Sequence, residues 1–115
     1  HHPPFKTGMR IMDDYGLKDA SGLAALVARY PEIERISAGH LHRAMQTRFA
    51  GTVASVCPSA AHQIALDFPE DMPLRFVMEP PGFQLHRWTA ASGLVTHTMP
   101  IGDFAGPYLY RKEKE

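Results

Sequence analysis

The sequence contains only one cysteine and has no net charge. A single cysteine, Cys57, excludes an intrachain disulfide framework and a zinc site built from cysteines. Twelve Lys and Arg residues are balanced by 12 Asp and Glu residues, so there is no basic field to hold a nucleic-acid backbone or an anionic membrane. We therefore expect neither a nucleic-acid polymer nor a membrane among the partners.

Long apolar runs are also missing. No stretch reaches the roughly 18 to 20 apolar residues that a membrane-spanning helix needs, and no basic-then-apolar secretion signal is visible. With its lone cysteine the chain fits a reducing compartment, and we expect a cytoplasmic location. Hydrophobic residues make up 44% and charged residues 21% of the 115 positions. These values predict one small folded domain, or part of a larger one.

One helix is clear from the apolar spacing. Apolar residues fall at i, i+3, i+4 and i+7 on one stripe, formed by Leu23, Leu26, Val27 and Tyr30. Asp19 or Ser21 can cap the first turn of this helix, and Pro31 ends it. Residues 1–18 carry prolines and glycines and are predicted to form a loop.

Strands follow the helix. A short strand is predicted over 33–38, and alternating patterns with turn residues between them predict about six strands, over 47–50, 53–57, 62–68, 74–78, 83–89 and 94–99. One main helix and one mixed sheet make an α+β fold, in which the sheet needs a cover on its other face. We expect a domain over 1–110 and a solvated charged tail over 111–115.

Seven histidines are the unusual feature. Segment 39–43 reads Gly-His-Leu-His-Arg after a predicted strand, and its glycine allows a tight turn that presents His40 and His42 toward one place. A second cluster, His-His-Pro-Pro, occupies 1–4. If the strands before the two loops are neighbours, His1, His40 and His42 converge at one sheet edge.

Two readings of these histidines stay open. Neutral imidazole is a common ligand of zinc, iron and manganese, but a His-x-His pair is also typical of surface histidines in a turn. The histidines at 1–2 fit the middle of a functional motif in a longer protein, and they also fit the remnant of an expression tag.

The two histidine segments together resemble a known family. Segments 1–5 and 38–43, followed by 58–63, 82–86 and 105–110, are similar to the C-terminal half of the calcineurin-like metallophosphoesterases. The similarity is greatest to the cyclic-nucleotide and glycerophosphodiester phosphodiesterase branch. It implies half of a four-layer α/β sandwich, in which two facing sheets enclose a dinuclear metal centre.

The resemblance implies roles for particular residues. His1 and His40 would ligate one metal and His42 the other, the two ions being iron, manganese or zinc. A metal-activated water would hydrolyse a small-molecule phosphodiester, a cyclic nucleotide or a glycerophosphodiester. The family's Asp-x-His and Gly-Asn-His motifs do not occur in this sequence, and its one Gly-Asp pair, at 102–103, follows the histidine segments instead of preceding them. We therefore expect this chain alone to hold at most one weakly bound metal.

Two further residues are candidates for catalysis. His62 matches a family position near the substrate phosphate, although a strand histidine bonded to its neighbours gives the same pattern. Arg43 either contacts the phosphate or pairs with a nearby acid. His86 and His97, on the predicted terminal hairpin, are interpreted as structural or surface residues.

Alternatives to an enzyme remain at this point. The chain could be a non-catalytic half-domain, or a small zinc-binding module that uses His1, His40 and His42. Several predicted strands carry apolar residues on both faces. We therefore expect the chain to form a homo-oligomer that covers them.

Overall fold

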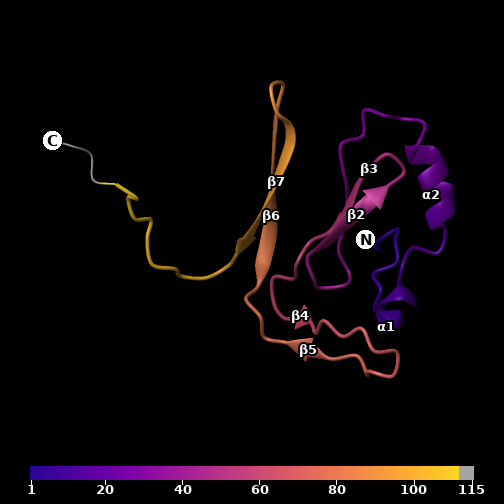
Figure 1. Ribbon diagram of the computed structural model, residues 1–115, viewed down its shortest axis with the longest axis horizontal. Helices are drawn as coiled ribbons and strands as arrows, with labels where there is room; N and C mark the ends of the chain where they lie inside the picture. Colours follow the sequence, from indigo (N-terminus) through magenta and orange to yellow (C-terminus); the bar gives the residue numbers. More distant parts are fainter. Residues whose placement is uncertain (112–115) are drawn as a thin grey trace.

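The computed structural model describes residues 1–111. Its elements are, in chain order, α1 (Arg10–Asp13), α2 (Ala20–Val27), β1 (Ile36–Ala38), β2 (Met45–Phe49), β3 (Thr52–Val56), β4 (Gln63–Ile64), β5 (Phe76–Val77), β6 (Gly82–Thr89) and β7 (Gly93–Pro100). Figure 1 shows the helices and β1–β3 on one side, and the β6–β7 hairpin standing apart on the other. Of the predicted tail, residues 112–115 lie outside the described part.

Helix α2 confirms the predicted helix and its cap. The Asp19 side chain accepts a hydrogen bond from the backbone N–H of Gly22. The helix ends at Val27, one turn earlier than the stripe to Tyr30 suggested. The Tyr30 N–H bonds back to the Val27 carbonyl at 3.0 Å, because Pro31 disfavours helical backbone at the residue before it.

The prediction of a loop over 1–18 is wrong at one point, because it contains the short helix α1. Thr7 donates from its backbone N–H and its hydroxyl to the Asp13 carboxylate, at 2.6 and 2.8 Å. This closes the segment around α1, and Met9 and Met12 are buried. A single turn is too short to produce a helical period in the sequence.

The central sheet has three strands in the order β1-β3-β2. Strand β1 runs parallel to β3, and β2 and β3 form an antiparallel hairpin. Ala50 and Gly51 connect them with φ values of 48° and 89°, as a tight two-residue hairpin turn requires. The strands predicted over 47–50 and 53–57 are confirmed as this hairpin, and its turn lies one residue earlier than the predicted gap at 51–52.

The prediction of one sheet with about six strands is wrong. The strands of the described residues form three separate sheets, since β4 pairs only with β5 and β6 only with β7. The two-residue strands β4 and β5 are much shorter than the predicted 62–68 and 74–78. Prolines at 69, 73, 80 and 81 flank β5, and they lack the N–H that a longer ladder needs. The strand-rich mixed architecture remains compatible with half of a metallophosphoesterase fold.

The buried core is small and lies beneath the histidine loops. It consists of Met9, Met12, Ala38, Leu41 and Val56. Leu41 is 1% exposed, so the side chain between the two loop histidines is anchored in the core.

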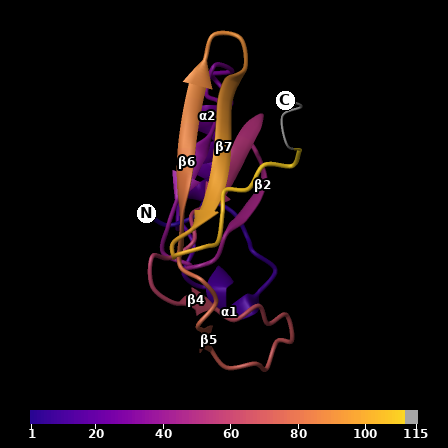
Figure 2. The same cartoon turned by 90° about the vertical axis from the view of Figure 1, so that its left-hand side faces the viewer.

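Outside this core much apolar surface is exposed. The β6–β7 hairpin is a two-stranded arm that stands apart in Figure 1 and is seen from its face in Figure 2, and Trp88 on it is 62% exposed. The extended segment beyond it exposes Tyr108 and Leu109 still more. None of the helices in residues 1–111 has the length and apolar character to cross a membrane.

The core predicts a stability effect. In the full-length protein, Leu41→Ala should lower the free energy of unfolding by about 2–5 kcal/mol, since it leaves a cavity under the histidine loop. Urea unfolding measures this, with Leu109→Ala as a control because Leu109 is 82% exposed. Equal small losses for the two variants would contradict the packing described.

Candidate metal centre

The loops at 1–4 and 39–42 meet at the end of β1. The backbone N–H of Gly39 donates to the His1 carbonyl at 3.0 Å, and the two imidazoles face one another, with His1 Nε2 3.1 Å from His40 Nδ1. His1 and His40 are thus brought together, as expected of loops that share one sheet edge.

The separation of these two nitrogens fits a shared ion. Two imidazole nitrogens bound to one metal at about 2.0–2.1 Å, with an angle of about 90–110° between them, lie roughly 2.9–3.4 Å apart. The observed 3.1 Å is within this range. The donor set is also suitable, since imidazole serves zinc, iron and manganese.

Both loop histidines have strained backbones. His40 has φ 68° and His42 has φ 44°, in the left-handed region that side chains other than glycine rarely adopt. A hydrogen bond of 2.7 Å from the Leu41 N–H to the Gly39 carbonyl closes a three-residue turn around His40. Such conformations cost about 1–3 kcal/mol each and gather at functional sites.

His42 lies beside His62. Their ring nitrogens Nδ1 and Nε2 are 3.3 Å apart, and the Ile64 N–H donates to the His42 carbonyl at 2.8 Å. The other neighbour of the His62 ring is Phe76, with ring centroids 5.0 Å apart. Strands β4 and β5 therefore bring His62 and an aromatic wall to the His42 side of the loop.

The histidine rings at the site form two groups: His1, His2 and His40 lie together, and His42 lies beside His62. Within residues 1–111, no group of three or more His, Cys, Asp or Glu side chains is arranged to hold a metal ion. This geometry gives no support to a zinc module in which His1, His40 and His42 share one ion. The assignment of His42 to a second ion stays a prediction.

The electrostatic surroundings favour the neutral form of His40. Burial, and after it the charges of His2 and His42, lower the pKa of His40 below its usual value. The His2 ring is the near neighbour, with its centroid 4.4 Å from that of His40. Neutral imidazole is the form that ligates metals.

Arg43 points away from the histidines. Its guanidinium forms an ion pair with Glu79 at 2.8 Å and donates from Nε to the Ile64 carbonyl at 2.7 Å. Together with Ala44 and Pro80, Arg43 lines a hollow that none of the histidines lines. Of the two roles predicted for Arg43, pairing with an acid is the one that this geometry displays.

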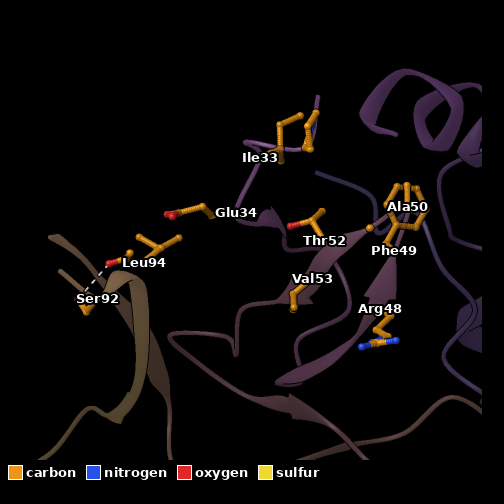
Figure 3. A pocket seen from close by; sticks show the side chains of 12 residues that line it. Ile33, Glu34, Arg48, Phe49, Ala50, Thr52, Val53, Ser92 and Leu94 are labelled. Carbon is orange, nitrogen blue, oxygen red and sulfur yellow. Dashed lines mark hydrogen bonds between the residues drawn. The ribbon is translucent and has the colours of Figure 1, made fainter. Parts of the chain in front are cut away.

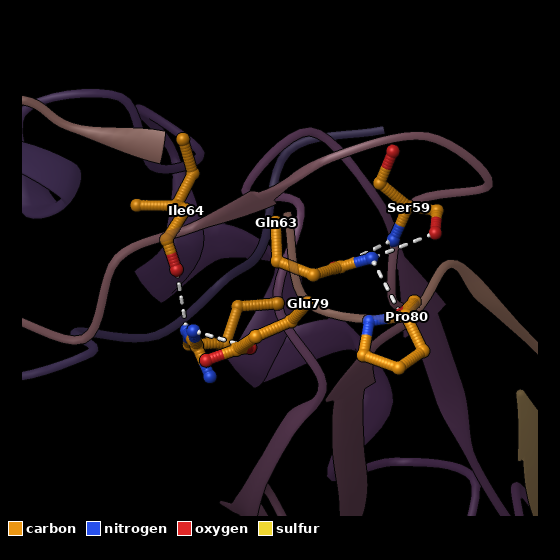
Figure 4. A network of polar contacts seen from close by, with 6 residues as sticks. Ser59, Gln63, Ile64, Glu79 and Pro80 are labelled. Carbon is orange, nitrogen blue, oxygen red and sulfur yellow. Dashed lines mark hydrogen bonds and ion pairs between the residues drawn. The ribbon is translucent and has the colours of Figure 1, made fainter. Parts of the chain in front are cut away.

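A buried amide that the sequence analysis missed holds the segment before β4. Gln63 is 4% exposed; its side chain accepts from the Ser59 N–H at 3.0 Å and donates to the Ser59 carbonyl at 2.8 Å and, more weakly, to the Pro80 carbonyl at 3.5 Å. Figure 4 shows these contacts beside the Glu79 ion pair. They fix the chain next to His62, and only the folded structure reveals them.

Other candidate positions lie elsewhere. His86 is on β6, where its Nδ1 is 2.8 Å from the Thr96 hydroxyl, and His97 is exposed on β7. A hollow of about 700 Å³ between the β6–β7 tip and the β2–β3 turn is shown in Figure 3. Glu34 and Arg48 line it, but none of the predicted site residues does.

Comparison with known proteins gives clear relatives. The chain is 43% identical over 115 residues to a probable glycerophosphodiester phosphodiesterase GpdQ from Arcobacter nitrofigilis, covering 99% of this chain and 42% of that protein. It is 31% identical over 110 residues to the glycerophosphodiester phosphodiesterase GpdQ of Enterobacter lignolyticus, covering 96% and 39%. A 3',5'-cyclic adenosine monophosphate phosphodiesterase CpdA from Vibrio vulnificus matches at 33% identity over 63 residues, or 55% and 23%. No family model matches the chain.

These relatives confirm the resemblance seen in the sequence. The matches are consistent with the C-terminal half of a metallophosphoesterase of the calcineurin-like type. The relatives are named as glycerophosphodiester and cyclic-nucleotide phosphodiesterases. The chain spans about two fifths of the length of the first two relatives.

The His1–His40 pair predicts a loss of metal on mutation. His40→Ala in the full-length protein should lower the metal content by about one ion per chain, because one of two facing imidazole ligands is removed. Elemental analysis after gel filtration measures this, with His97→Ala as the matched control. Equal metal content in the two variants would show that His40 is not a ligand.

Proposed function

We propose that this chain is the C-terminal part of a dinuclear-metal-dependent phosphodiesterase that hydrolyses cyclic nucleotides or glycerophosphodiesters. The observation that carries the proposal is the strained loop after β1, which presents His40 to His1 and His42 to His62. It occurs in a chain related to proteins named as phosphodiesterases.

The metal ligands are assigned by pair. His1 and His40 hold one ion, and His42 belongs to the other. When bound, two such ions lower the pKa of water and neutralise the attacking and leaving oxygens of an in-line displacement. The chain contributes by positioning the imidazoles of His1, His40 and His42. Burial of Leu41 and the backbone hydrogen bonds of Gly39 hold the loops that carry them.

His62 is the proposed substrate contact. Its ring is within hydrogen-bond distance of His42. Both histidines line a hollow of about 300 Å³. A phosphate oxygen placed beside His42 is therefore within reach of the His62 imidazole, which donates a hydrogen bond to it. Arg43 enters the proposal as an ion-paired residue that holds β4 in place.

We also propose that the protein self-associates and works in the cytoplasm. The β6–β7 arm and the segment after it expose large apolar side chains, among them Trp88 and Tyr108. Covering them gains roughly 25 cal/mol per Å², and a second copy offers the same surface. The free thiol of Cys57 fits a reducing compartment.

A ligand substitution tests the catalytic assignment. In the full-length protein, His42→Ala should lower kcat by more than about 100-fold, since a lost ligand displaces the charge that stabilises the transition state. His97→Ala should change it less than about twofold. Parallel kinetics on a phosphodiester, with metal analysis of both variants, decide this, and similar losses would remove His42 from the site.

Sedimentation tests self-association. The full-length protein should sediment as a dimer or larger species at micromolar concentration, and Trp88→Glu should shift it toward monomer by placing a charge on the apolar arm. Ser21→Glu, at an exposed position of α2 away from the arm, is the charge-matched control. A wild-type protein that stays monomeric would contradict the proposal.

A further inference from the structure

The candidate site lines a hollow of about 300 Å³. Its lining combines two kinds of side chain. The imidazoles of His40, His42 and His62 are one kind, and the apolar or aromatic side chains of Met12, Tyr15 and Leu74 are the other. A ligand that fills this hollow therefore meets both imidazole and apolar surface.

Tyr15, which lines the hollow, is held in place by its neighbours. The turn after α1 is closed by a hydrogen bond of 3.0 Å from the Tyr15 N–H to the Met12 carbonyl, and Met12 itself is buried in the core. The Tyr15 and His40 rings lie with centroids 6.2 Å apart and planes tilted by 58°. Tyr15 is 50% exposed, so a face of its ring is available to a ligand.

The chemistry of the apolar side chains restricts what the hollow accepts. Apart from the Tyr15 hydroxyl, Met12, Tyr15 and Leu74 offer no strong hydrogen-bonding side-chain group. A polyol placed there would lose hydrogen bonds to water without replacing them. A flat aromatic group would instead stack on the ring of Tyr15 and cover Leu74.

We propose that Tyr15 and Leu74 form the subsite for the organic ester group of the substrate, and that this subsite favours phosphodiesters with an aromatic ester group, such as a nucleobase or aryl group, over glycerol phosphodiesters. This inference rests on the proposed phosphodiesterase function. It assigns the phosphate to the imidazoles and the ester group to Tyr15 and Leu74.

The test compares two substrate classes on the full-length, metal-loaded protein. The value of kcat/KM is measured for 3',5'-cyclic AMP and bis(4-nitrophenyl) phosphate, and for glycerophosphoethanolamine. Tyr15→Ala should lower it about tenfold for the two aromatic substrates and less than about twofold for the glycerol ester. Tyr15→Phe should retain the wild-type preference, because the ring and not the hydroxyl makes the contact.

Two further variants secure the result. Leu74→Ala, at the other residue of the subsite, should reduce the same preference by about threefold. Tyr30→Ala is the matched control, since Tyr30 is a 44% exposed tyrosine that does not line the hollow. Thermal melts and metal content verify that each variant is folded and loaded.

The outcomes separate the two levels of inference. Equal losses on aromatic and glycerol substrates, or loss of preference in Tyr15→Phe, would overturn the subsite while leaving the phosphodiesterase function standing. No turnover of any phosphodiester by the wild-type protein would overturn the proposed function, and the subsite with it.

Discussion

Burial of Leu41 is the interaction on which the candidate site depends. Its side chain lies in the core with Met9, Met12 and Val56, and the residues on either side of it, His40 and His42, both have positive φ. Burying a leucine gains about 1.5–3 kcal/mol, while two left-handed non-glycine residues cost about 1–3 kcal/mol each. Together the two residues cost about 2–6 kcal/mol, more than one leucine offsets over most of that range, so further contacts help to hold the loop.

Two backbone hydrogen bonds supply those contacts. The Gly39 N–H is bonded to the His1 carbonyl, and the His42 carbonyl accepts from the Ile64 N–H. Each bond ties one strained histidine to the segment that carries its imidazole partner, His1 for His40 and His62 for His42. The same interactions that hold the strained loop therefore set the pairing of the side chains. Hydrogen bonds of Gln63 to Ser59 and of Arg43 to the Ile64 carbonyl add to the contacts of the two-residue strand β4.

Much of the fold could be predicted from local patterns in the sequence, whereas the rest depends on contacts between segments far apart in the chain. The Asp19 cap and the hairpins β2–β3 and β6–β7 depend on neighbours in the chain, and they were predictable. The division into three sheets was not, because alternation shows that a segment is extended but not which strand it pairs with. In the site, the two histidine motifs were visible, whereas Gln63 and Tyr15 were not. Their roles come from segments brought together only by folding.

The charge balance of the site limits what this chain can hold by itself. Two divalent ions about 4 Å apart repel each other by four times the roughly 4 kcal/mol of a unit pair at an effective dielectric of 20. Neutral imidazoles donate electron pairs but do not cancel that charge. Within residues 1–111, no metal-binding group combines carboxylates with the histidines. Under the proposed function, we therefore expect a second ion to need anionic ligands in addition to these histidines. We expect the His1–His40 pair by itself to hold at most one weakly bound ion.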